Sequence, residues 1–203
     1  MNNTIYTIGY SSFSIERFID VLKKYKITAL VDVRSHPYSR FKPEFNLDNL
    51  KKELLKHNIA YVFLGEECGA RVNDPTCYID GKVNYDLVAR TKKFKKGLTR
   101  IKKGMKKYTI VLMCAEKDPV VCHRTILISR HLQLLGILIK HILSDGTVED
   151  HTVTEKRLLK LFKLDSPNLF FSKEQLLNNA YSLQGEKIAY QAAHQLNNKV
   201  VGQ

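Results

Sequence analysis

The sequence predicts an α/β protein with three layers: a mostly parallel β-sheet flanked by helices, followed by a helical C-terminal extension. Short apolar and β-branched runs alternate with segments whose apolar residues recur at helical spacing. Polar clusters follow several of these runs, as expected where parallel strands end together and open sheets place their ligands. Strand–helix–strand units of this kind place helices on both faces of the sheet.

Five segments have the composition of strands. They are residues 4–8, 29–33, 60–64, 108–113 and 137–143. The segment 108–113 is apolar or β-branched almost throughout, which is typical of a strand buried on both faces. We expect this strand and the loop after it to be the centre around which the chain is organised.

Helices are expected between these strands. They are residues 14–24 with Ser14 as N-cap, residues 46–57 with Asn46 as N-cap, residues 85–103, and residues 118–136. The last of these starts with Asp118-Pro119 and ends with Gly136, which follows the preference of Asp and Pro for helix starts and of Gly for helix ends.

The alternation of strand and helix patterns ends near residue 150, and only helical patterns follow. We expect an α/β core domain over residues 1–150 and a helical extension over residues 151–203 that packs on the core. In the extension, Thr154 is expected to cap one helix and a second helix is expected to start near Ser172. The last dozen residues are polar, and we expect them to fray.

Composition limits the classes of protein. With 203 residues and 44% hydrophobic content the chain can bury one good core. It has no apolar run of about 20 residues and no signal pattern at its start, so we expect a soluble, cytoplasmic protein without a membrane partner. Four cysteines in such a chain are expected to be thiols, catalytic groups or metal ligands rather than disulfides. The 33 basic and 20 acidic residues give a net charge of +13, which favours anionic partners such as nucleic acid.

One loop concentrates reactive side chains. Cys114, Glu116, Cys122, His123 and Arg124 lie within eleven residues, directly after the 108–113 strand. The helix start expected at Asp118-Pro119 would add unpaired backbone N–H groups and a positive dipole end. This field favours an anion and a thiolate. The competing interpretation is that both cysteines are small core residues.

Four stretches of the chain share the pattern of one protein family: residues 7–11, 32–39, 65–71, and 113–116 with 122–124. Through them the chain resembles a widespread prokaryotic family, catalogued as domain of unknown function 488. Cys68-Gly69-Ala70 departs from the leucine-glycine-glycine usual in that family. The resemblance implies a shared α/β fold and a shared site, and it implies no reaction.

From the residues we expect two groups at the site. The catalytic candidates are Cys114, Glu116, Cys122 and His123, as thiols or as acid and base. The anion-binding candidates are Ser11, Arg34, Ser35, Arg71 and Arg124. For Arg34, Arg71 and Glu116 the alternative is an ordinary loop, surface or capping role.

Two more specific assignments, a phosphatase loop and a structural zinc site, have less support in the sequence. Phosphatase loops of the tyrosine-phosphatase type place arginine six residues after the cysteine, but Val120 stands there. A structural zinc site could use Cys114, Cys122, His123 or His36, yet the chain has no Cys-x-x-Cys and Cys68 and Cys77 lack the usual finger spacing. We therefore expect neither a metal nor a cofactor.

The segment 90–107 holds ten Lys and Arg residues and no acidic residue. Phe94, Leu98, Ile101 and Met105 would form its buried stripe, which leaves the lysines on the outer face. The candidates for contact with nucleic-acid phosphates are Lys92, Lys93, Lys95, Lys96, Lys102 and Lys103. A simply solvated face is the alternative.

Together these features predict an enzyme acting on an anionic, phosphate-bearing substrate, which could be nucleic acid. The alternative is a non-catalytic nucleic-acid-binding module whose pocket only holds phosphate. A structural metalloprotein is the third interpretation. The sequence names neither the substrate nor the oligomeric state.

Overall fold

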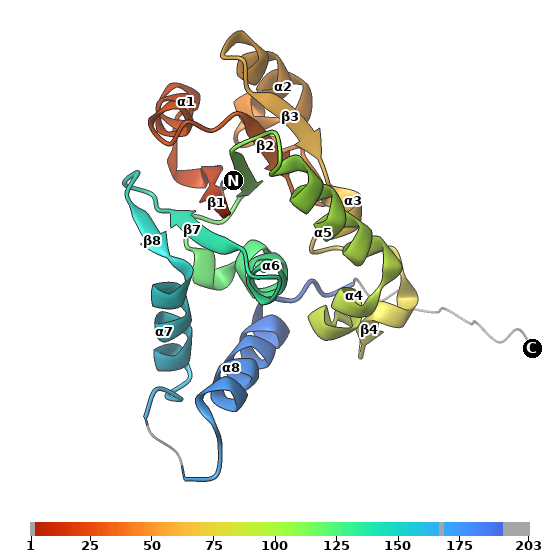
Figure 1. The fold of residues 1–203 in the computed structure, drawn as a ribbon. Helices are drawn as coiled ribbons and strands as arrows, with labels where there is room; N and C mark the ends of the chain where they lie inside the picture. The colour runs from red at the N-terminus through yellow and green to blue at the C-terminus, as the bar shows by residue number, and fades with distance from the viewer. Residues whose placement is uncertain (1–2, 167–168, 193–203) are drawn as a thin grey trace, which may run out of the picture.

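A six-stranded sheet lies at the centre of the computed structural model, which describes residues 3–166 and 169–192 (Figure 1). The strand order is β3-β2-β6-β1-β7-β8. The strands are β1 (Thr4–Gly9), β2 (Ala29–Asp32), β3 (Ala60–Phe63), β6 (Ile110–Cys114), β7 (Leu138–Ile142) and β8 (Val148–Asp150). All neighbours pair in parallel except β7 and β8. The predicted α/β fold with a mostly parallel sheet is confirmed.

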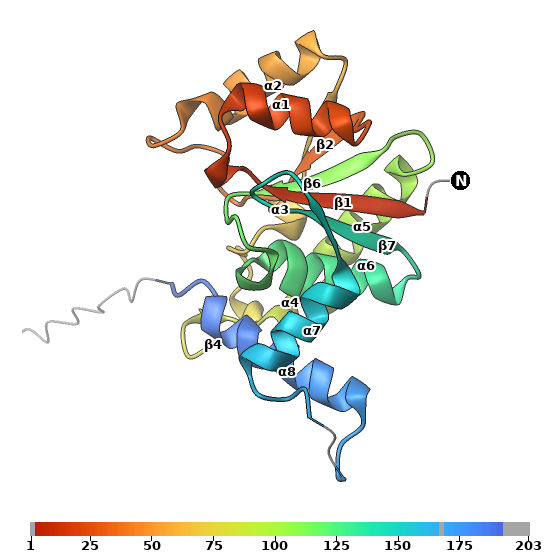
Figure 2. The ribbon, with the colours of Figure 1, turned by 90° about the vertical axis from the view of Figure 1, so that its left-hand side faces the viewer.

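Helices cover both faces of the sheet (Figure 2). One face carries α1 (Ile15–Lys24) and α2 (Leu47–Lys56). The other carries α5 (Lys92–Gly104), a π-helix (Arg124–Ser129) and its continuation α6 (Arg130–Leu134). The short α3 (Gly65–Cys68) and α4 (Tyr85–Arg90) lie beside α5. A small hairpin of β4 (Tyr78–Ile79) and β5 (Lys82–Val83) precedes α4.

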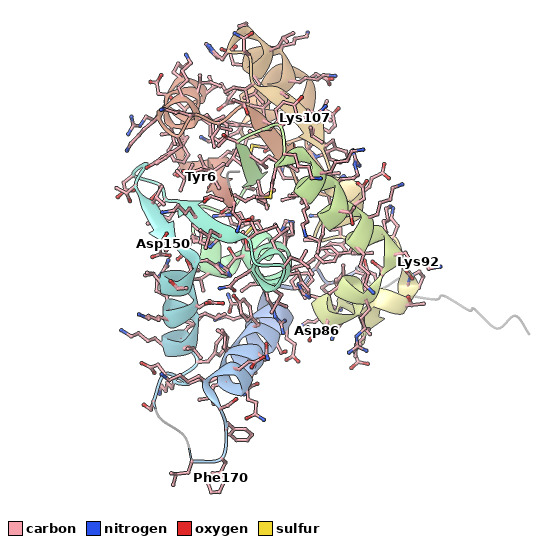
Figure 3. All side chains as sticks on the ribbon, in the orientation of Figure 1. Tyr6, Asp86, Lys92, Lys107, Asp150 and Phe170 are labelled. Carbon is pink, nitrogen blue, oxygen red and sulfur yellow. The ribbon has the colours of Figure 1, made fainter. Side chains whose placement is uncertain are left out.

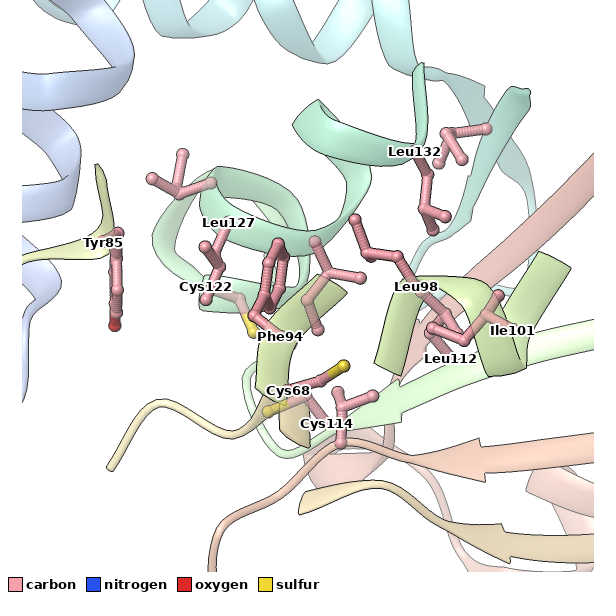
Figure 4. Close-up of a cluster of buried hydrophobic side chains, with 14 of the residues drawn as sticks. Cys68, Tyr85, Phe94, Leu98, Ile101, Leu112, Cys114, Cys122, Leu127 and Leu132 are labelled. Carbon is pink, nitrogen blue, oxygen red and sulfur yellow. The ribbon is translucent and has the colours of Figure 1, made fainter. Parts of the chain in front are cut away.

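Strand β6 shows why its sequence is apolar throughout. Val111 and Met113 face the cluster that α1 and α2 cover, whereas Ile110, Leu112 and Cys114 face the cluster on the opposite side. Successive side chains of a strand point to opposite faces, so both must be apolar when both faces are covered. The alternation also places the Cys114 thiol on the side of the π-helix (Figure 4).

The C-terminal helices α7 (His151–Leu161) and α8 (Lys173–Ile188) pack on the core. Helix α7 contacts β7 and β8, and α8 contacts the π-helix and α4. The predicted start near Ser172 is confirmed, because Ser172 and Gln175 form a capping box. The frayed end that we expected lies outside the described residues.

Several predicted boundaries are wrong, each for a local reason. The helix expected over 85–103 is two helices, because Thr91 has an extended backbone and its side chain accepts a hydrogen bond from the Phe94 N–H, which starts α5 anew. Helix α7 starts at His151 and not at Thr154, whose hydroxyl is buried and donates to Glu149. Asn46 precedes α2 but its side chain accepts from the Ser39 N–H instead of capping the helix.

Candidate functional site

Four side chains from one ten-residue segment converge at the carboxyl end of β6. We call Cys114, Glu116, Cys122 and His123 the site cluster. One potential ligand atom from each, the two Sγ atoms, a carboxylate oxygen and an imidazole nitrogen, lies within 4.8 Å of all the others. Cys114, Cys122 and His123 are buried, and Glu116 is exposed. The structure therefore brings together all four predicted catalytic residues.

The loop between Cys114 and Cys122 contains less helix than predicted. Asp118 accepts a hydrogen bond from the Val120 N–H, and Pro119–Val121 forms only a single 3₁₀ turn. Cys122 then has an extended backbone, with φ −130° and ψ 139°. The long helix begins at Arg124 as a π-helix, so Cys122 and His123 precede it instead of lying in its first turn. Their side chains can therefore turn back toward Cys114.

His123 is fixed in one tautomer by the backbone of a neighbouring strand end. Its Nε2 lies 3.1 Å from the carbonyl oxygen of Val33, which can only accept, so Nε2 carries the proton. Nδ1 then faces the thiols, 3.7 Å from the sulfur of Cys114 and 3.9 Å from that of Cys122. Although burial opposes it, hydrogen bonding to Cys122 and the charge of that thiolate raise the pKa of His123.

Glu116 joins the cluster from its solvent side. Its Oε2 accepts from the Cys114 thiol and from the Cys122 thiol, each at 3.0 Å. The residue as a whole is exposed, but its carboxyl group is partly buried against the two thiols. This burial, followed by the negative charge of Cys122, raises the pKa of Glu116. Glu116 is thus the member of the site cluster that solvent reaches.

The two thiols of the site cluster differ. The hydrogen bond to Cys122 and burial raise the pKa of Cys114. Burial opposes ionisation of Cys122 as well, but the hydrogen bond from Cys114 and the positive charge of Arg124 lower the pKa of Cys122. Cys122 is therefore the thiol of the pair that ionises first.

Arg124 is a buried residue whose side chain holds the loop of the site cluster in place. It is fully buried, and its Nη1 and Nη2 donate to the carbonyl oxygens of Glu116 and Lys117 while Nε donates to Thr7 Oγ1. Gly9 allows the same loop to lie close to β1, because a Cβ at Gly9 would come within 1.8 Å of the Glu116 carbonyl oxygen. Every guanidinium nitrogen of Arg124 thus has a protein acceptor and holds the loop.

Arg34 is occupied in a similar way. It forms a buried ion pair with Asp32 at 2.6 Å, donates to the Phe45 carbonyl oxygen and lies over the ring of Tyr10. Only its Nη1 is buried without a hydrogen-bond partner among the described residues. Anion binding by Arg34 and Arg124 stays a prediction, and both side chains already have internal partners.

The other anion-binding candidates are Ser11, Ser35 and Arg71, and none of them is buried. Ser11 is exposed, and its N–H donates to the Ala115 carbonyl oxygen, beside the site cluster. Ser35 is half-buried and its hydroxyl accepts from the Arg71 N–H, but the Arg71 guanidinium turns away and lies over Tyr190. His36, one of the four zinc candidates, is exposed and stands outside the site cluster.

The six predicted lysines lie on α5 and are all exposed, as are Lys106 and Lys107 after it (Figure 3). Phe94, Leu98 and Ile101 are buried and Met105 is half-buried, which confirms the apolar stripe. A groove of about 480 Å³ lies along this helix, and we call it the lysine groove. It is lined by four basic and three other side chains: Lys95, Lys102, Lys103, Lys106, Leu98, Thr99 and Leu135. Only Lys93 of the six has an ion pair among the described residues, with Glu66 at 3.6 Å.

Sequence reasoning missed a buried hydrogen-bond chain that leads from the C-terminal helices to Arg124. Tyr181 OH contacts His151 Nε2 at 3.0 Å, and His151 Nδ1 contacts His141 Nε2 at 2.8 Å. His141 Nδ1 contacts Thr7 Oγ1 at 2.7 Å, the same hydroxyl that accepts from Arg124. A histidine in an apolar strand was the only signal, and it does not reveal a partner on another element.

The remaining cysteines are core residues. Cys68 and Cys77 are buried and free, and burial raises the pKa of Cys68 to about 12. A Cβ at Gly97 would lie 2.6 Å from the Cys68 sulfur, so α5 packs directly on this thiol. Both cysteines stand outside the site cluster.

Comparison with known proteins adds one finding to this geometry. A family model described as domain of unknown function DUF488 matches residues 14–131, more than half of the chain. The chain belongs to the DUF488 family. No curated protein and no solved structure matches it. The DUF488 match includes the whole site cluster and ends before His141, so the buried histidine chain lies partly beyond it. Among the described residues no helix combines the length and the apolar composition that crossing a membrane requires.

Proposed function

We propose that this DUF488 protein is an enzyme that acts on an anionic, phosphate-bearing substrate at the site cluster. The observation that carries the proposal is the convergence of two thiols, an imidazole and a carboxyl group at the carboxyl ends of parallel strands, where open α/β sheets bind ligands. Structural packing alone has no need of four such groups within 4.8 Å.

In this proposal Glu116 exchanges protons with the substrate, because it is the exposed member and partial burial of its carboxyl group raises its pKa. The exposed Lys117 beside it and the net charge of +13 favour approach of an anion. His123, held by Val33, keeps the thiols oriented beneath the carboxyl group.

The experiment is a turnover screen with purified protein and three substrate classes: phosphomonoesters, nucleotides and short oligonucleotides. Glu116→Gln should lower turnover at least about 100-fold, as loss of a general acid or base does. Glu66→Gln, on the exposed surface of α3, is the matched control and should not change turnover. The proposal fails if none of the three classes is turned over, or if Glu116→Gln is as active as the unchanged protein.

A specific observation supports a second candidate, a nucleic-acid-binding module. The lysine groove along α5 lies on an exposed helix surface, and basic side chains on one face bind nucleic-acid phosphates without reading bases. Phe94 is buried, so this surface lacks its ring for base stacking. The two candidates are independent, because the groove extends to Lys106 and Leu135, which precede the starts of β6 and β7, whereas the site cluster lies at the carboxyl end of β6.

A further inference from the structure

We propose that the site cluster binds one Zn²⁺ ion, with Cys114, Cys122 and His123 as buried ligands and Glu116 as the exposed fourth ligand. This reverses our expectation that the protein holds no metal. The donor set of two sulfurs, one imidazole nitrogen and one carboxylate oxygen is among the sets that zinc prefers.

The distances from His123 to the two sulfurs match a tetrahedral site, and those from Glu116 are about 0.6 Å short of it. With zinc bonds of about 2.3 Å to sulfur and 2.05 Å to nitrogen, two tetrahedral ligands lie about 3.6 Å apart. Nδ1 of His123 lies 3.7 Å from the Cys114 sulfur and 3.9 Å from the Cys122 sulfur. Glu116 Oε2 lies closer, at 3.0 Å from each sulfur, and would move outward by about 0.6 Å to reach the tetrahedral separation. As Glu116 is the exposed member, this movement is toward solvent.

The surroundings orient the donors as they do in metal sites. A metal-binding histidine normally donates its other ring N–H to a carbonyl or carboxylate, and His123 donates from Nε2 to the Val33 carbonyl. Nδ1 is thereby left without a proton in the neutral ring and faces both sulfurs. Arg124 holds the loop that carries Glu116 through two backbone carbonyl groups.

This inference rests on the proposed function, because it places an ion at the same reaction centre. Binding would release the protons of whichever thiols are not already ionised, leaving two thiolate–zinc bonds and a charge-neutral imidazole ligand. Glu116 could then give way to a substrate oxygen, which the ion would polarise, whereas the three buried ligands stay in place.

The test is metal analysis of the full chain without a histidine tag. After incubation with zinc and gel filtration, the unchanged protein should retain about one zinc ion per chain. Cys114→Ser, Cys122→Ser and His123→Asn should each retain less than roughly one tenth of that amount. Glu116→Gln should retain the ion with weaker affinity, because water can take the fourth position. Cys68→Ser and Cys77→Ser, the two other buried thiols, are matched controls and should retain it.

A second measurement does not depend on folding of the variants. Cobalt added to the unchanged protein should give thiolate-to-cobalt charge-transfer absorption and the intense visible bands of a tetrahedral site, and zinc should abolish them. Absence of these bands, absence of retained zinc, or a Cys114–Cys122 disulfide in the freshly purified protein overturns the proposal. Metal binding without turnover leaves a structural zinc site and removes the enzyme. Turnover in protein shown to be free of metal leaves the enzyme and removes the zinc site.

Discussion

Arg124 donates a hydrogen bond from Nη1 to the backbone carbonyl oxygen of Glu116, eight residues earlier in the chain. The site loop is therefore tied to the helix that follows it by a side chain that has no solvent exposure. The same guanidinium group also binds Lys117 and Thr7, so one residue connects the loop, β1 and the π-helix.

Replacing Arg124 by methionine should destabilise the protein by about 3 kcal/mol or more, since the buried Thr7 hydroxyl and two partly buried backbone carbonyl groups lose a charged donor. Urea denaturation followed by circular dichroism measures the change. Arg90→Met, at an exposed position at the end of α4, should change the free energy of unfolding by less than about 0.5 kcal/mol. Equal effects of the two substitutions would contradict the role assigned to Arg124.

Gly9→Ala should destabilise the protein by roughly 1–3 kcal/mol, because the new methyl group would overlap the Glu116 carbonyl oxygen. Gly185→Ala in α8 is the control: its Cβ would meet side-chain atoms only at 3.5 Å or more. Alanine also favours a helix over glycine, so this change should be neutral or stabilising by up to about 1 kcal/mol. Thermal unfolding of both variants checks the expectation, which fails if Gly9→Ala is the better tolerated.

The buried histidine pair should make stability depend on pH. Burial lowers the pKa of His151 to about 4 and lowers the pKa of His141 as well. Below a pH of about 6.5 the unfolded chain binds protons that the folded chain excludes, so stability should fall as the pH drops from about 6.5 toward 4. The difference between the pKa of His151 in the unfolded chain, 6.5, and in the folded chain, about 4, corresponds to about 3 kcal/mol at full effect.

Charged groups near His141 and His151 also affect how stability depends on pH. The positive charges of Arg124 and Arg157 also disfavour protonation of His141. Glu155, 3.8 Å from His151, acts in the opposite direction, because burial raises its pKa and the folded state binds its proton more readily. Denaturant titrations at a series of pH values should therefore show a smaller loss for His151→Gln than for the unchanged protein. His36→Gln, at an exposed position, should keep the full loss. A loss that is identical in all three proteins would rule out the buried pair as its source.

The lysine groove predicts a salt-dependent, sequence-independent affinity for nucleic acid. Each phosphate contact changes the slope of log K against log salt by about 0.9 for a duplex. Lys95→Gln, Lys102→Gln and Lys103→Gln together should flatten this slope by up to about three contacts. The control is the triple change of Lys51, Lys52 and Lys56 to glutamine on α2, which removes the same charge from an exposed helix elsewhere. Fluorescence anisotropy with two unrelated oligonucleotides measures both. Equal weakening by both triple variants would indicate net charge alone, and no binding at low salt would remove nucleic acid as a partner.

Five strands of the sheet and the four members of the site cluster could be predicted from the sequence, because both depend on local order. The edge strand β8 and the β4–β5 hairpin were not predicted, because strands of two or three residues are too short to show a pattern. Apolar runs such as 108–113 indicate strands, and the four cluster residues lie in one short segment of that same region. The partners of Arg34 and Arg124 were not predictable, since whether a guanidinium binds a ligand or a backbone carbonyl depends on contacts across the fold. The same holds for His141, whose neighbours His151 and Thr7 come from α7 and β1.

The position of β1 in the sheet also has a consequence for how the protein is made. β1 lies between β6 and β7, and its pairing partners, such as Val111 for Tyr6 and Ile142 for Ile8, follow more than a hundred residues later. At typical rates of synthesis the first strand must wait on the order of ten seconds before both neighbours have left the ribosome. Until then the backbone N–H and C=O groups along both of its edges lack their strand partners, and contacts between such distant segments form slowly. The carboxyl ends of β1, β2 and β6 meet beside the site cluster, so the cluster can form only after β6 and the loop behind it have been synthesised.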